Sequence, residues 1–159
     1  MNVRIGHGFD AHRLELGRPF ILGGVRIPCD RGPLGHSDAD VVAHAIADAL
    51  LGAAALGDLG QHFPDSEARW KDANSMDLLG AVRGMLDAAN YRVGNVDVTV
   101  VVQAPRLAPF IGAMRASLAQ TLGLQVNMIS IKAKTSEGLG YTGDGSGIAA
   151  YAVALIGGA

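Results

Sequence analysis

The chain has 159 residues, of which 49 % are hydrophobic and 18 % are charged, a composition typical of a globular protein and not of a disordered chain. Its net charge of −2 gives no reason to expect a nucleic-acid polymer as a partner, but does not exclude a small anionic ligand. No apolar run approaches the roughly 20 residues of a membrane-spanning helix, the N-terminus lacks the apolar core of a signal peptide, and the lone Cys29 excludes an intramolecular disulfide and a Cys-rich zinc site. We therefore expect one cytoplasmic domain over residues 1–159.

The first part of the chain predicts a strand, a hairpin and a long helix. Residues 3–15 alternate enough for a strand, and the segment 19–28 predicts a hairpin, because two successive glycines supply the positive φ angles of a tight turn. Apolar residues recur at helical spacing over 37–57, where Ser37 or Asp38 could cap the helix.

The second part predicts two helices between strands. Helices are expected over 74–90 and 107–123, and strands over 95–105 and 128–135. Residues 147–156 read as a last strand, although their alanine content leaves a helix open. This order predicts an α/β (α+β) sandwich: a small sheet of about four main strands with helices packed on one face, plus an N-terminal hairpin.

A candidate metal site lies in the first strand and the first helix. Asp10 and His12 are two residues apart, so a strand presents both on one face. A catalytic zinc site uses three protein ligands, and His44, among the apolar residues of the helix, is the best third donor. Asp48, one turn further on, could accept the second N–H of His44. Spacing alone leaves the ordinary alternative open, in which His44 is simply packed or exposed.

Three loops carry further polar groups. Residues 56–67 place Asp58 and other acids in a Gly/Pro-bearing loop that suits hydroxyl recognition, with a solvated surface turn as the alternative. Residues 103–109 join a strand to a helix N-terminus, where free N–H groups and Arg106 favour an anion. The glycine-rich segment 132–147 matches neither the phosphate-binding P-loop nor the dinucleotide fingerprint.

These segments together resemble one known family. The motifs RIGHGFDAH, LGGVRIP, HSDADVVAHAIADALLGAAALGDLG, FPDS, NVDVTVVVQAP and KTSEGLGYTGDGSGIA are similar to those of the 2-C-methyl-D-erythritol 2,4-cyclodiphosphate synthases, in unbroken order from about Arg4 to about Leu155. The resemblance implies a homotrimer with active sites between subunits. It also implies conversion of 4-diphosphocytidyl-2-C-methyl-D-erythritol 2-phosphate to the cyclic diphosphate and CMP, in the non-mevalonate isoprenoid pathway.

The resemblance also implies metal ligands and catalytic residues. Asp10, His12 and His44 match the family's divalent-metal ligands, usually occupied by zinc, and Glu137 matches the protein ligand of a second ion, magnesium or manganese, that binds with the substrate diphosphate. His36 and Thr135 match residues that stabilise the transition state. No enzyme nucleophile is required, because the substrate's own 2-phosphate attacks the β-phosphorus; catalysis then depends on positioning and charge stabilisation.

The expected substrate contacts fall into two groups. The methylerythritol side is expected to use Asp10, Ala11, His12, His36, Ser37, Asp58, Leu59, Gly60, Phe63, Pro64, Asp65, Ser66 and Glu67. The cytidine diphosphate side, from the adjoining subunit, is expected to use Val102, Gln103, Ala104, Pro105, Arg106, Leu107, Ala108, Lys134, Thr135, Ser136 and Glu137, together with Tyr141 and Asp144.

Three features of the sequence depart from the family pattern. Arg106 replaces a common lysine, which keeps the charge but changes the donor geometry, and Ser66-Glu67 replaces a common Thr-Asp pair. Asp144 and Ser146 stand where the bacterial pattern has an arginine and a glutamate. That arginine helps hold an isoprenoid diphosphate on the trimer axis, so we expect weak binding of such a ligand. Two other functions stay open: a zinc-dependent nucleotide-diphosphate hydrolase, disfavoured because no base lies beside a water position, and a non-catalytic nucleotide-binding trimer.

Overall fold

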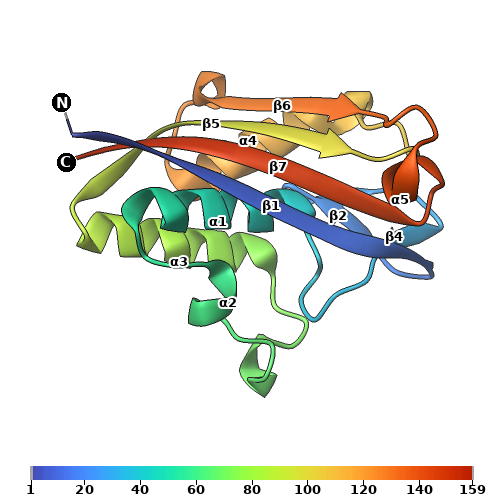
Figure 1. Ribbon diagram of the computed structural model, residues 1–159, viewed down its shortest axis with the longest axis horizontal. Helices are drawn as coiled ribbons and strands as arrows, with labels where there is room; N and C mark the ends of the chain where they lie inside the picture. Colours follow the sequence, from blue (N-terminus) through green and yellow to red (C-terminus); the bar gives the residue numbers. More distant parts are fainter. Residues whose placement is uncertain (1, 159) are drawn as a thin grey trace.

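The computed structural model describes residues 2–158 and shows a mixed sheet with helices on one side (Figure 1). Five strands pair in the order β4-β1-β7-β5-β6, and only β5 and β6 are parallel. The strands are β1 (Val3–Leu16), β4 (Arg31–Pro33), β5 (Tyr91–Val101), β6 (Ile129–Lys134) and β7 (Gly147–Gly158). The end residues of the expected domain, Met1 and Ala159, lie outside the described residues.

The helices form a layer on one face of this sheet. In Figure 1, α1 and α3 run below β1 and β7, while α4 lies behind β5. The long helices are α1 (Val41–Ala54), α3 (Ser75–Ala88) and α4 (Ile111–Leu122); short helical turns are α2 (Leu59–His62), α5 (Gly140–Gly143), Ala68–Trp70, Ala108–Phe110 and Val126–Met128. Within residues 2–158, no helix combines the length and apolarity needed to cross a bilayer.

The predicted architecture is confirmed. Four long strands build the sheet, the short β4 extends its edge, and the predicted hairpin pairs β2 (Phe20–Leu22) with β3 (Val25–Ile27). Residues 147–156, for which the sequence allowed either a strand or a helix, belong to the strand β7. This strand pairs with β1 along one edge and with β5 along the other. In this extended form the side chains alternate between the faces: Ala150, Ala152 and Ala154 are fully buried, whereas Tyr151 and Val153 are exposed.

Glycines in β1 allow α1 to lie unusually close to the sheet. A Cβ atom added at Gly8 would lie 1.9 Å from the carbonyl oxygen of Ala45, and one at Gly6 would lie 1.8 Å from that of Ala49. No other residue type fits there without moving the helix. This close packing brings the His44 side of α1 directly against Asp10 of β1.

The start of α1 differs from the prediction. Asp40, not Ser37 or Asp38, is the N-cap: its side chain accepts hydrogen bonds from the N–H groups of the second and third helical residues. It also accepts from the backbone N–H groups of Gly23 at 2.9 Å and Gly24 at 2.8 Å, in the turn between β2 and β3. Burial raises the pKa of Asp40, although these backbone donors act against the shift. One buried carboxylate thus joins the hairpin to the helix.

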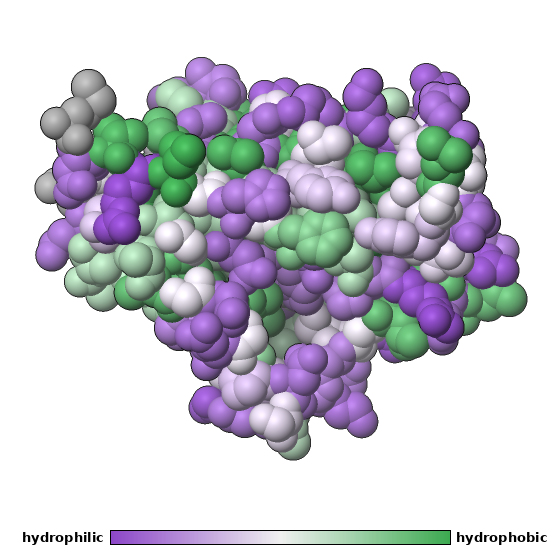
Figure 2. All heavy atoms as spheres, viewed as in Figure 1, coloured by the Kyte–Doolittle hydropathy of each residue, from purple (hydrophilic) through white to green (hydrophobic). Residues whose placement is uncertain are grey.

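Within residues 2–158, none of the long helices covers the other face of the sheet, and apolar side chains lie on it. Figure 2 shows green side chains among purple and white ones along the strands that face the viewer in Figure 1. The large hydrophobic side chains exposed on β1 and β7 include Val3, Ile5, Phe9, Tyr151 and Val153. Phe9 and Tyr151 are cross-strand partners with ring centroids 5.1 Å apart.

Candidate metal and phosphate site

The structure brings Asp10, His12 and His44 together, as predicted. Their potential ligand atoms all lie within 4.8 Å of one another. Asp10 Oδ2 is 3.0 Å from His12 Nε2 and 3.0 Å from His44 Nδ1. The two-residue repeat of β1 directs the first two side chains to the helix face, and the close approach of α1 supplies the third.

The hydrogen bonds of His12 leave its inner nitrogen free for a metal. Its Nδ1 lies 2.9 Å from the carbonyl oxygen of Leu34, which can only accept, so Nδ1 carries a proton. Within residues 2–158, the buried Nε2 has no hydrogen-bond partner although it lies 3.0 Å from Asp10 Oδ2. A lone pair facing a carboxylate oxygen is repulsive unless a cation lies between them. The three side chains therefore fit a divalent cation.

The pKa shifts of Asp10 and His44 both arise from the contact between the carboxylate and the imidazole. Burial by itself would raise the pKa of Asp10, but the neighbouring imidazoles of His44 and His12 hold it below its ordinary value. Burial would likewise lower the pKa of His44, but the hydrogen bond and negative charge of Asp10 outweigh it and raise that pKa. The site therefore favours positive charge, which a bound dication can supply in place of the proton.

Asp48 does not contact the outer nitrogen of His44, so that prediction is wrong. Its Oδ1 instead accepts the backbone N–H of Leu59 at 2.7 Å, at the start of α2. Helical side chains lean toward the N-terminus of their helix, so His44 Nε2 meets groups that precede α1 and begin α3. It lies 2.8 Å from Ser75 Oγ and 3.2 Å from Ser37 Oγ. Sequence reasoning missed Ser75 because a serine at a helix start is ordinary.

The acidic loop before α3 has a mixed role. Asp58 is the N-cap of α2 and accepts the backbone N–H of Gln61 at 2.9 Å, but its side chain stays exposed. Asp65 and Ser66 are also exposed, whereas Phe63 is buried and packs edge-on against Trp70 with centroids 5.0 Å apart. Phe63 therefore anchors this loop, and the exposed acids are available to a ligand.

A second cluster forms where β5 and β6 end. Val102, Gln103, Pro105, Arg106, Leu107 and Ala108 line a cavity of about 280 Å³ together with Ala133, Lys134 and Thr135. The two segments meet because β5 and β6 are parallel, so their carboxyl ends share one edge. The peptide between Ala104 and Pro105 is cis. Glu137, just beyond, has a φ of 53°, a left-handed conformation uncommon outside glycine.

The two clusters lie on one line across the sheet but well apart. Asp10 pairs with Ala150, Ala150 with Val100, and Val100 with Ala133. Three strand spacings separate the first strand of this row from the last, a distance of about 14 Å. The metal cluster and the β5–β6 cavity are thus separate surfaces of one chain.

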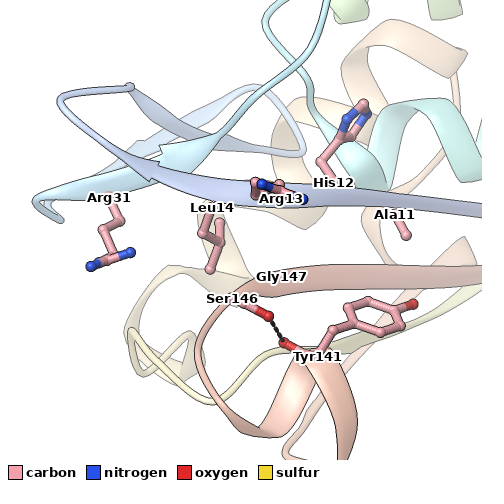
Figure 3. A pocket seen from close by; sticks show the side chains of 8 residues that line it. All are labelled: Ala11, His12, Arg13, Leu14, Arg31, Tyr141, Ser146 and Gly147. Carbon is pink, nitrogen blue, oxygen red and sulfur yellow. Dashed lines mark hydrogen bonds between the residues drawn. The ribbon is translucent and has the colours of Figure 1, made fainter.

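Tyr141 and Asp144 line two further cavities, which share Leu14, Arg31 and Ser146. His12 and Tyr141 both line a cavity of about 550 Å³. In Figure 3, His12 points from β1 toward α1, whereas Tyr141 extends beside β7. Ala11 and Arg13 line the same cavity from β1. Asp144 lines a neighbouring cavity and accepts hydrogen bonds from Ser146 that lower its pKa. Its carboxylate is therefore negatively charged at neutral pH.

The family model described as the YgbB family matches residues 3–157, nearly the whole chain. The chain belongs to the YgbB family. A relative from Syntrophomonas wolfei, named 2-C-methyl-D-erythritol 2,4-cyclodiphosphate synthase, is 58 % identical over 154 residues, which cover 97 % of this chain and 98 % of the relative.

Solved structures similar to this YgbB-family chain extend over almost all of it. The bifunctional IspDF of Campylobacter jejuni matches with a TM-score of 0.95 and 39 % identity over 99 % of this chain, which spans 42 % of that longer protein. A Plasmodium falciparum protein, described as an IspF–CDP complex, matches with a TM-score of 0.87 and 32 % identity over 99 % of this chain and 97 % of its own.

Proposed function

We propose that this YgbB-family chain converts 4-diphosphocytidyl-2-C-methyl-D-erythritol 2-phosphate to 2-C-methyl-D-erythritol 2,4-cyclodiphosphate and CMP, a step of the non-mevalonate isoprenoid pathway. The observation that carries this function is the 58 % identity over almost the full length of a relative of that name. The Asp10, His12 and His44 cluster supports it, because phosphoryl transfer needs concentrated positive charge.

The reaction exchanges one phosphorus–oxygen bond for another. An oxygen of the 2-phosphate forms a bond to the β-phosphorus, and the bond from that phosphorus to the CMP oxygen breaks, so CMP leaves with the electron pair. A divalent cation, proposed to be zinc, held by Asp10, His12 and His44 would act as a Lewis acid on a phosphate oxygen. The protein's own part is to orient the two phosphates in line and to exclude water.

His36 and Thr135 are proposed to hold the reacting phosphates. Within residues 2–158, the buried Nε2 of His36 has no hydrogen-bond partner, so it is available to a phosphate oxygen. Thr135 lines the β5–β6 cavity beside Lys134 and Arg106, a second source of positive charge. We propose that Glu137 binds a magnesium or manganese ion with the diphosphate, since exposed carboxylates suit hard cations.

We further propose a homotrimer in which neighbouring subunits complete each site. Within one chain, about 14 Å separates β1, which carries Asp10 and His12, from β6, which borders the β5–β6 cavity. A cavity supplied by a second copy would accommodate one extended substrate. The uncovered sheet face, with Phe9 and Tyr151 exposed, offers an apolar surface for such contacts. We also propose a single domain and a cytoplasmic location.

The decisive experiment supplies the cytidyl substrate with zinc and magnesium and follows phosphorus NMR. The proposed function predicts a cyclic diphosphate and CMP in equal amounts. Linear phosphates alone would indicate a hydrolase, and no turnover would indicate a nucleotide-binding protein; either result would refute the proposal. Sedimentation measurements test the trimer separately.

A further inference from the structure

A hydrogen-bonded chain runs from the candidate metal site to a carboxylate that the expected chemistry does not use. His44 Nε2 lies 2.8 Å from Ser75 Oγ, and Ser75 Oγ in turn contacts Asp38 Oδ1. The backbone N–H of Ser75 also donates to Asp38 Oδ2 at 3.1 Å. Ser75 is only 1 % exposed, so water does not compete for these bonds.

The direction of each bond in this chain follows from the carboxylate. An ionised Asp38 has no proton to donate, so the hydroxyl proton of Ser75 must point to it. With that proton committed, Ser75 Oγ can only accept from His44 Nε2, which therefore carries a hydrogen. A neutral His44 is then left with its lone pair on Nδ1, the atom 3.0 Å from Asp10 Oδ2.

We propose that Ser75 and Asp38 are positioning residues that fix the tautomer and orientation of His44, so that Nδ1 is the nitrogen presented to the metal. This inference rests on the metal site of the proposed function and adds two residues to it. The carbonyl of Leu34 performs the same task for His12 through its backbone. Such partners of ligating histidines typically change metal affinity by about 10–100-fold.

The surrounding backbone holds both residues in place. Ser75 is the first residue of α3, whose N-cap is Asn74. The N–H of Asp38 donates to the carbonyl of Ala73 at 3.1 Å, and the N–H of Asp72 donates to the carbonyl of His36 at 2.9 Å. The segment that carries His36 is thereby joined to the segment that ends the acidic loop.

Asp38→Asn tests the direction of the bonds with almost no change in size. Both carboxylate oxygens of Asp38 accept from Ser75, one from the hydroxyl and one from the N–H. An amide has one acceptor and one donor end, so it cannot satisfy both. If its NH₂ faces the hydroxyl, Ser75 is driven to donate to His44 Nε2, which moves the imidazole proton to Nδ1. The metal would then meet an N–H.

The experiment measures zinc affinity of the full chain by competition with a chromophoric chelator. We expect Ser75→Ala and Asp38→Asn each to weaken zinc binding by about 10–100-fold. The visible spectrum of the cobalt-loaded protein should change in both variants, because a ligand has moved. Asn74→Ala is the matched control: it removes the cap of the same helix, whose side chain accepts the N–H of Met76 at 2.9 Å, without contacting His44. Its zinc affinity should equal that of the parent.

Thermal unfolding of the metal-free variants separates misfolding from a local effect on the site. If Ser75→Ala does not fold, the zinc affinity of Asp38→Asn alone is the test. The typical effect of losing such a partner is about 10–100-fold in affinity. The inference is overturned if Ser75→Ala and Asp38→Asn both bind zinc within about twofold of the parent. Failure of the metal assignment itself looks different. In that case His44→Ala binds zinc as tightly as the parent, or the parent binds none.

Discussion

Gly8→Ala is expected to damage both the fold and the metal site, although alanine suits a strand better than glycine. The new Cβ would lie 1.9 Å from the carbonyl oxygen of Ala45 and 2.7 Å from the amide nitrogen of Ala49. A carbon–oxygen contact needs about 3.3 Å, so α1 must move away from β1 by about 1.4 Å at this point. Both contacts are backbone atoms, and no side chain can rotate out of the way.

The magnitude follows from this displacement. Overpacking of this kind costs about 1–3 kcal/mol, against a gain of about 0.5–1 kcal/mol from replacing glycine inside a strand. His44 adjoins Ala45 on the displaced helix, so its Nδ1 would move from its place 3.0 Å from Asp10. Metal ligands tolerate errors of only about 0.2 Å. We therefore expect a net loss of stability together with a large loss of zinc affinity.

Urea unfolding of the metal-free chain and a chelator-competition assay measure the two effects. Gly52→Ala is the matched control, because Gly52 lies in α1 with open space around its Cβ position. Gly52→Ala should stabilise the protein by up to about 1 kcal/mol and should not change its zinc affinity. A Gly8→Ala variant as stable as the parent, with unchanged zinc affinity, would refute the close-packing argument.

Four further outcomes are expected. His44→Ala should lose zinc and nearly all turnover while its melting curve stays cooperative; full activity would overturn the ligand assignment. Zinc affinity, measured across pH, should rise as the pH increases through and above about 6.5, because the raised pKa of His44 lets protons compete to higher pH; a flat profile would contradict this. Asp40→Ala should destabilise the chain by about 3 kcal/mol in urea unfolding, since it removes a helix cap and leaves two turn N–H groups without their acceptor; a change below about 1 kcal/mol would be inconsistent with that role. Geranyl or farnesyl diphosphate should bind weakly in calorimetry because Asp144 is anionic, and tight binding would disprove the repulsion.

Local patterns determined much of the fold and part of the site. The two-residue period of β1 places Asp10 and His12 on one face whatever surrounds them, and the apolar spacing of α1 predicts a helix that buries the side carrying His44. These are properties of a few consecutive residues, so the three candidate ligands could be named in advance. Their convergence within 4.8 Å agrees with that expectation.

Other features depend on what packs against each segment. The alanines of β7 favour neither state locally, and only the strands on both sides select the extended form. Asp40 became the cap because a hairpin distant in sequence supplied two further donors to the same carboxylate. These choices are made by partners that the local sequence does not contain.

The sequence by itself determined that Asp10 and His12 share one face of a strand and made His44 a candidate third ligand, because strand and helix periods are local geometry. Only the tertiary structure decided which group hydrogen-bonds to the outer nitrogen of His44. The local sequence favoured Asp48 as the partner of His44, one turn along the same helix, but Ser75 of α3 reaches the outer nitrogen at 2.8 Å while Asp48 is engaged with α2. The direction of a side chain between two helices depends on their packing, and packing joins residues that lie 31 positions apart.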